Sequence, residues 1–201
     1  MKKSAILIAA LFLLVNANAQ KIHFGIKGGV NTSNLGYDNN TNTDNKIGFN
    51  FGLLAHLHAS KTWAIQPELI YSLEGASYKT IPQGTTHINL NYINVPVLLE
   101  YMFHNGFRLE GGPQMGFLIN AKRKTSDVSV TDNSFESTSV SIPLGVGYLT
   151  SSGLGIDARY VFGLSNINED KSGPVIQSNV FQLGLFYQFT DTKIHRQRSR
   201  R

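Results

Sequence analysis

The sequence contains no cysteine and, after its first twenty residues, no long hydrophobic run. The absence of cysteine excludes disulfides, catalytic thiolates and zinc-thiolate sites. Without a second apolar run of about 18 residues, the mature chain is not expected to cross a membrane as a helix. Charged residues are also scarce, at 15% of the chain, compared with about 25% in ordinary soluble domains.

The first twenty residues, MKKSAILIAALFLLVNANAQ, have the parts of a secretory signal peptide. Lys2 and Lys3 form the charged start, an apolar run follows, and Ala17 and Ala19 are the small residues expected before a cleavage site. A buried N-terminal helix is the alternative, but it needs neither of these features. We therefore predict a signal peptide at residues 1–19 and an exported protein.

The formal net charge of +5 comes from the two ends of the chain. Lys2 and Lys3 belong to the predicted signal peptide, and five more basic residues lie among the last nine. What remains has 11 basic against 13 acidic residues, so no nucleic acid partner is expected. Residues 190–201 are predicted to be a separate basic tail.

Eight segments between these ends alternate apolar and other residues with the period of two that is typical of β-strands. They are residues 22–30, 47–58, 63–74, 88–103, 107–120, 139–149, 154–164 and 180–189. Three connections, ASKT, HNG and TSSG, are tight-turn material. The others are polar and roughly 12 to 18 residues long, so the pattern predicts an eight-stranded antiparallel up-and-down barrel over residues 20–189.

The two faces of these strands differ in a way that bears on which side meets water. A soluble lipocalin-like carrier places the apolar face inside, and a membrane barrel places it against lipid. The polar face here is rich in Gly, Ser, Asn and Gln, which suits a narrow lumen. The apolar face carries aromatic residues near the strand ends, as a membrane barrel requires: Trp63, Tyr71, Tyr101, Tyr148, Tyr160, Tyr187 and Phe189. We therefore predict a transmembrane barrel in the outer membrane, in contact with its lipid.

Two features depart from the simple pattern. When the fourth segment is phased from Ile93, Leu90 and Tyr92 fall out of phase. Four prolines also lie inside predicted strands, where a missing N–H breaks a ladder bond: Pro67, Pro96, Pro113 and Pro143. We hypothesise that these prolines form a band of β-bulges that tightens the barrel.

Several stretches resemble a known family. FGIKGGVNTSNL, QPELIYSLEGA, YINVPVLLEY, GGPQMGFLI and FQLGLFYQF are similar to the small outer-membrane barrels abundant in Bacteroidetes, called PorT-like or outer membrane protein beta-barrel domain proteins. The resemblance covers almost the whole mature chain. It implies the barrel fold and the outer-membrane location, and it implies no particular activity.

The polar face contains eight charged residues that are predicted to lie in the lumen: Lys27, Glu68, Glu74, Glu100, Arg108, Glu110, Asp157 and Arg159. Arg108 and Glu110 are two residues apart, as are Asp157 and Arg159, so each pair shares one face of its strand. A charged constriction that selects ions is one interpretation. A salt-bridged plug is the favoured one, because an eight-stranded barrel is too narrow for an open pore.

Three histidines, His23, His56 and His58, are expected to gather near the short-turn end. Imidazoles are ligands for zinc or nickel, but no carboxylate stands at ligand spacing beside them. We therefore predict no metal site and no cofactor, with these histidines as a weak candidate.

Calcium binding and catalysis find little support in the sequence. The stretch DNNTNTDNK has oxygen ligands at alternate positions, but Thr43 and Phe49 stand where a calcium loop needs Gly and Glu. There is no G-x-S-x-G motif, and Ser77, His87 and Asp127 are loop residues that nothing in the sequence brings together. The protein is predicted not to be an enzyme.

The final predicted strand ends on an aromatic residue. Its lipid-facing positions are Phe181, Leu183, Leu185, Tyr187 and Phe189. The residues between them are Gln182, Gly184 and Gln188, with Phe186 as the one apolar exception. This end resembles the terminal signal that the barrel-assembly machinery reads during insertion. It differs from the usual signal because twelve residues follow it.

The function that these observations favour is a structural or interaction scaffold with surface-exposed loops. The partner that this function implies is an unidentified protein at the loops or at the tail. The alternatives are a narrow channel, an accessory protein in secretion or assembly, and a soluble carrier.

Overall fold

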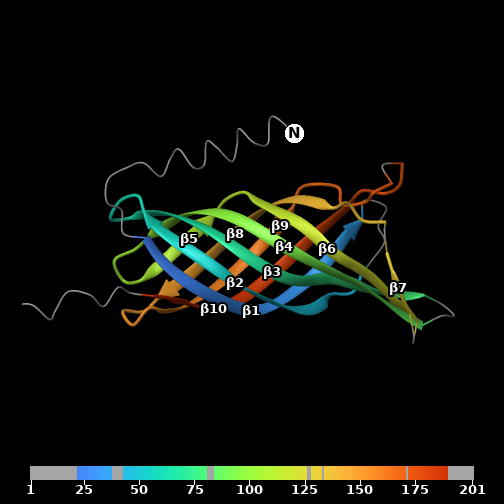
Figure 1. Cartoon of the computed structure of the whole chain (residues 1–201), viewed down its shortest axis with the longest axis horizontal. Coiled ribbons are helices and arrows are strands. Elements are labelled where there is room, and N and C mark those ends of the chain that lie inside the picture. The colour runs from blue at the N-terminus through green and yellow to red at the C-terminus, as the bar shows by residue number, and fades with distance from the viewer. Residues whose placement is uncertain are drawn as a thin grey trace, which may run out of the picture.

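The computed structural model describes residues 22–37, 43–80, 84–125, 128–132, 134–170 and 172–189. The predicted signal peptide and basic tail lie outside these ranges. The described residues form ten strands (Figure 1): β1 (Ile22–Tyr37), β2 (Lys46–His58), β3 (Trp63–Thr80), β4 (Gly84–Met102), β5 (Phe107–Gly111), β6 (Gln114–Thr125), β7 (Val128–Thr131), β8 (Thr138–Leu149), β9 (Leu154–Gly163) and β10 (Ile176–Gln188). No helix in these ranges is long and apolar enough to cross a membrane.

The strands close into an antiparallel barrel with eight wall positions. β10 pairs with β1, from Gly25↔Gln188 to Tyr37↔Ile176, and this ladder joins the two ends of the chain. β5 and β6 share one wall position, because β4 and β8 each pair first with one and then with the other. β7 pairs with β6. The predicted eight-stranded membrane barrel is confirmed, and the count of ten arises from the interruption at Gly112–Pro113 and from the additional β7.

The apolar faces of the strands point away from the barrel. On β10, Phe181 and Leu185 are exposed, while Gln182 and Gln188 are buried. On β2, Phe51 is 61% exposed and its neighbour Asn50 is 3% exposed. A soluble carrier would show the reverse arrangement, so that alternative is wrong.

The three short connections lie at one end of the barrel, which we call the turn end; the opposite end is the loop end. Gly106 and Gly153 end two of these turns with φ of 90° and 89°, a conformation that residues with a Cβ rarely adopt. Each donates its N–H back across the turn, to Phe103 O at 3.2 Å and to Thr150 O at 3.1 Å. These contacts explain why these two turns are short and contain glycine.

The loop end differs from the prediction. β3 and β4 continue in one register to Thr80↔Gly84, and β6 and β7 form a second hairpin from Lys122↔Thr131 to Thr125↔Val128. These residues were expected to be long polar loops. They form strands because their alternation continues with the faces reversed: beyond the lipid belt, polar residues face outward and apolar residues face inward.

The reversal creates an apolar core at the loop end, formed by Leu35, Ala76, Ile88, Leu90, Tyr92, Ala121, Phe135, Ile167 and Ile176. Leu90 and Tyr92 therefore face the same side of β4 as the polar residue Asn94. The inner face of the fourth segment carries polar residues in the lumen and apolar residues where it packs against the core of the loop end. The irregularity is therefore not a change of phase.

The band of proline bulges is not observed. Pro143 lies in a continuous β8–β9 ladder, opposite Val161. The β3–β4 register is the same on both sides of Pro96, and β4 and β8 keep their register past Pro113. In the described ladders the register shift lies elsewhere, between Asn91 and Tyr92 of β4 opposite β6. That hypothesis is wrong, because the prolines are accommodated without an extra residue.

Candidate functional site

The centre of the lumen is occupied by Arg159, which β9 directs toward the opposite wall. Its Nη1 and Nη2 donate to Glu68 Oε2 and Oε1 of β3 at 2.6 and 2.7 Å. The same guanidinium donates to Glu110 of β5, through Nε and through Nη2 at 3.1 Å to Oε2. Bidentate pairs of this kind are the strongest that arginine forms. Three strands that are not neighbours in the wall are thus joined through one side chain.

A second ion pair joins β1 to β9 across the intervening β10. Lys27 Nζ lies 2.8 Å from Asp157 Oδ1, and both side chains are buried. The β10 residue between them is Gly184, which stands opposite both Asp157 and Gly29. A Cβ on Gly184 would lie 3.2 Å from both Asp157 Oδ1 and Lys27 Cε. Glycine at this position therefore gives the ion pair the space that it occupies.

A third group fills the lumen toward the turn end. Glu100 Oε2 accepts from Arg108 Nη1 at 3.0 Å and lies 3.2 Å from His56 Nδ1. The same His56 nitrogen lies 3.1 Å from Gln66 Oε1. Both neighbours of Nδ1 are acceptors, so this nitrogen carries a proton.

Phe186, the apolar exception in the last predicted strand, has a place in this group. Arg108 Cζ lies 5.4 Å from the centre of its ring, within the range of a cation–π contact. The ring rests on Gly155, where a Cβ would lie 2.2 Å from Phe186 Cζ. Phe186 is therefore lumen packing that pairs with a cation.

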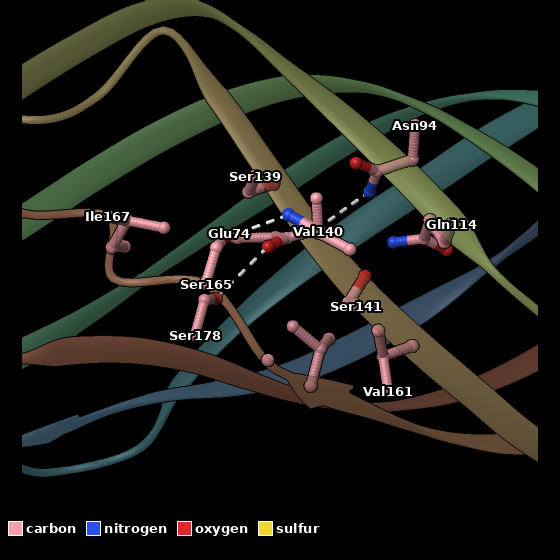
Figure 2. Close-up of a pocket in the computed structure, with 12 residues that line it drawn as sticks. Glu74, Asn94, Gln114, Ser139, Val140, Ser141, Val161, Ser165, Ile167 and Ser178 are labelled. Atoms are coloured by element: carbon pink, nitrogen blue, oxygen red, sulfur yellow. Dashed lines mark hydrogen bonds between the residues drawn. The ribbon is translucent and has the colours of Figure 1, made fainter.

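Glu74 lies apart from these groups, near the apolar core of the loop end, and Figure 2 shows the residues around it. Its Oε1 accepts from Asn94 Nδ2 at 3.0 Å, and its Oε2 accepts from Ser178 Oγ at 3.3 Å. The carboxylate borders a cavity of about 20 Å³ that is also lined by Gln114, Ser139 and Ser141. A space of this size and polarity suits a water molecule.

A comparison with protein-family models identifies the barrel. Residues 18–169 match the model described as outer membrane protein beta-barrel domain. The chain belongs to this family. Membership places the barrel in the outer membrane, with its apolar belt in contact with lipid.

Two solved structures show the same fold. Neisserial surface protein A is 13% identical, with a TM-score of 0.56, over 83% of this chain and 97% of that chain. Ail of Yersinia pestis, in complex with the heparin analogue sucrose octasulfate, is 18% identical, with a TM-score of 0.53, over 84% of this chain and 99% of that chain. A comparison with curated proteins gives no match. At these identities the likeness concerns the fold alone.

The structure places all eight predicted lumen charges inside the barrel, each at most 6% exposed. Seven of them form the three groups described above, and Glu74 stands alone. Sequence reasoning missed several polar partners, chiefly Gln66, which donates to Glu68 Oε1 at 2.8 Å and contacts His56. Gln66 was on the polar face, but an uncharged side chain gave no reason to choose it.

The three histidines do come together at the turn end. The rings of His23 and His58 are 5.6 Å apart, and those of His56 and His58 are 4.7 Å apart, centre to centre. Both pairs are edge-to-face. Among the described residues, no group of three or more His, Cys, Asp or Glu side chains is arranged to hold a metal ion. The edge-to-face geometry is that of packed aromatic rings.

The other candidate sites were on the connections. Ser77 and His87 pair across β3 and β4, with Ser77 Oγ 2.7 Å from His87 Nδ1. A Ser–His–acid triad uses Nε2 for the serine and Nδ1 for the acid, so this contact has the wrong ring nitrogen. Asp127 lies outside the described residues. So does most of the stretch considered for calcium, residues 38–42.

The loop end has a polar cleft of about 400 Å³ between β6 and the segment after β7. Its lining includes Asn120, Thr131, Asp132, Ser137 and Glu169. Burial raises the pKa of Asp132, but hydrogen bonds from Ser134 and from the Arg123 guanidinium outweigh burial and hold the pKa below its usual range. The cleft is therefore bordered by a carboxylate that stays ionised.

Proposed function

We propose that this protein is a closed outer-membrane scaffold whose loop end binds a partner outside the cell. It acts without conducting ions and without catalysis. The observation that carries this proposal is the Arg159 group, in which one guanidinium joins Glu68 and Glu110 across the middle of the lumen. In this plug the charged side chains bind one another, so they are not available to line a pathway for ions.

The loop end supports the second half of the proposal. In outer-membrane barrels the short turns face the periplasm and the longer connections face outward. Here the outward end carries two extended hairpins, an apolar core that holds them together, and a polar cleft. A rigid platform of this kind suits recognition by contact, since little ordering is needed when a partner binds.

The finer parts of the prediction belong to this proposal. They are the PorT-like, Bacteroidetes-type assignment, the cleaved signal peptide, recognition of the last strand by the barrel-assembly machinery, and a periplasmic tail at residues 190–201. The sequence patterns described above support them. A role in secretion or assembly is the alternative, and no particular residue supports it.

Two experiments test the proposal. Planar-bilayer recordings of the purified full chain are expected to show no steady current, and a current that changes on Arg159→Gln would establish the channel instead. Photo-crosslinking in native membranes, from probes at Ser172 of the loop end and at Lys61 of the turn end, is expected to capture a protein at Ser172. Capture at Lys61 alone would move the interaction to the periplasm.

A further inference from the structure

β7 lies at the loop end of the barrel (Figure 1), and it pairs along one edge only within the described residues. One edge of this strand pairs with β6. Within the residues that the structure describes, no strand pairs with the other edge. An unpaired edge presents a row of backbone N–H and C=O groups to any strand that approaches it.

The side chains of β7 do not protect this edge. Its sequence, Val-Ser-Val-Thr, has high β-propensity and contains no charge, proline or glycine. All four residues are exposed, with Val128 at 66% and Val130 at 52%. Proteins usually blunt a free edge with lysine, proline or a bulge on the strand itself. A short strand also limits pairing, and β7 has only four residues. Because it carries none of the other devices, its edge remains open to a partner strand.

The end of β7 is also anchored to the rest of the protein. There, Asp132 Oδ2 accepts from Arg123 Nε at 2.9 Å, and Asp132 N donates to Ala121 O at 3.0 Å. Shortly afterwards, Phe135 is buried in the apolar core of the loop end. The end of the strand is therefore held against β6, and the chain that follows it is held by the apolar core. An anchored strand binds with a smaller loss of conformational freedom.

The two faces beside the edge specify the chemistry of the occupant. Val128 and Val130 lie on the inner face. Ser129 and Thr131 lie on the outer face, opposite Lys124 and Lys122 of β6. The short side chains of Ser129 and Thr131 leave both exposed lysines free to reach over them. A strand added at this edge would meet valines on one face and positive charge on the other.

We propose that β7 binds an extended segment of another protein by strand addition, and that this segment alternates apolar with acidic residues. The proposal rests on the proposed function and names its partner class. Apolar side chains of the segment cover Val128 and Val130, and its carboxylates lie within reach of Lys122 and Lys124. Backbone hydrogen bonds supply affinity, and the alternation supplies specificity.

A second copy of this chain in the same membrane is a poor occupant. Antiparallel edges of identical strands are related by a two-fold axis perpendicular to the sheet. The sheet here continues the barrel wall, so that axis lies in the plane of the membrane and would turn one barrel upside down. Copies inserted in one direction are related by axes along the membrane normal.

The test uses the full chain in lipid nanodiscs and three synthetic peptides: one alternating valine and glutamate, one alternating valine and lysine, and one with the first composition in scrambled order. The valine–glutamate peptide is expected to bind saturably and to slow hydrogen exchange of the β7 amides. Val128→Lys/Val130→Lys and Lys122→Glu/Lys124→Glu should each weaken binding by at least about tenfold. The controls Ser172→Lys and Lys61→Glu add or reverse charge elsewhere and should leave binding unchanged.

Three outcomes overturn the proposal: equal binding of the scrambled peptide, protection outside β7, or self-association that the β7 variants abolish. The crosslinks from Ser172 in native membranes separate this proposal from the proposed function. If they persist in Val128→Lys/Val130→Lys, the loop end binds a partner without the β7 edge. If Ser172 captures nothing in the unmodified chain, the proposed function fails as well.

Discussion

Arg159 and Glu68 meet across the lumen, from β9 and β3, through two hydrogen bonds of 2.6 and 2.7 Å. Ninety-one residues separate them in the chain. The pair therefore connects opposite walls of the barrel. Removing one partner leaves the charge of the other buried without a counter-ion. The first prediction follows from this relationship.

Replacing Arg159 by Met should lower the free energy of unfolding by about 3–5 kcal/mol, because Glu68 and Glu110 remain buried without their partner. Urea titration of the barrel in lipid vesicles measures this change. Arg159→Met combined with Glu68→Gln should recover part of the loss, since one orphaned charge is removed. Lys61→Met, on an exposed turn, is the control. Equal stability of Arg159→Met and the unmodified protein would contradict the plug.

Gly184→Val should destabilise the barrel by about 1–3 kcal/mol, because the added atoms press on Lys27 and Asp157. Gly28→Val is the matched control on the neighbouring strand, since a Cβ there meets nothing closer than 3.8 Å. The measurement is the temperature at which the folded form disappears in a heat-mobility gel. If the two variants lose the same stability, space at Gly184 is not what the ion pair requires.

Gly155→Ala should impair folding, because its Cβ would overlap the ring of Phe186. Phe186→Ala alone creates a void and removes the cation–π partner of Arg108, at a cost of about 3–5 kcal/mol. Residues in direct contact are not additive, so the double variant should be more stable than the sum of the single changes predicts. Strict additivity in urea titrations would show that the two positions act independently.

The β6–β7 hairpin should loosen at acidic pH. Because the pKa of Asp132 is lowered in the folded protein, its stabilising effect is complete above the unfolded value of about 3.9 and is lost as the pH falls through the lowered pKa. The protection factors of the β7 amides, measured by hydrogen exchange in nanodiscs and corrected for the intrinsic rate at each pH, should therefore fall in that range. Asp132→Asn should exchange faster at neutral pH and respond less to acid. An unchanged profile in Asp132→Asn would assign the effect to another group.

Deleting residues 190–201 should leave insertion intact, whereas Tyr187→Ser/Phe189→Ser should abolish it. The aromatic side chains at the end of β10 face outward, and Phe189, just after the strand, is 50% exposed. They are therefore accessible to machinery that recognises the last strand. Outer-membrane fractionation and heat-dependent gel mobility report insertion. Exposed Phe117→Ser on β6 is the control for a loss of apolar surface alone. The opposite pattern would assign insertion to the tail.

The barrel was predictable because its strands repeat one local rule. Each crossing alternates with a period of two, and the scarcity of charge on the polar face indicated which side meets lipid. The candidate charges Arg108 and Glu100 were also predictable as a pair, since one short turn separates them. The ion pair between Arg159 and Glu68 was not predictable, because no local pattern shows which distant strand a long side chain reaches across the lumen.

The loop end shows where the same rule misled. Leu90 and Tyr92 were interpreted by the pattern of the lipid belt, in which apolar residues face outward. Beyond the belt the outer face meets water and the inner face packs Leu35, Phe135 and Ile167 from distant connections. The alternation with a period of two continued, but the apolar residues now faced inward and the polar residues outward.

The sequence by itself determined the number of crossings, the lipid-facing side and the polar lining, because alternation and turn residues act over a few neighbours. Only the tertiary structure decided which charges pair, where the hairpins end and, within the described residues, that one edge of β7 has no paired strand. Those features depend on closure of the ring, which brings β1 beside β10 and sets the diameter across which Arg159 reaches. Closure is a property of the whole chain, so no segment of the sequence states it.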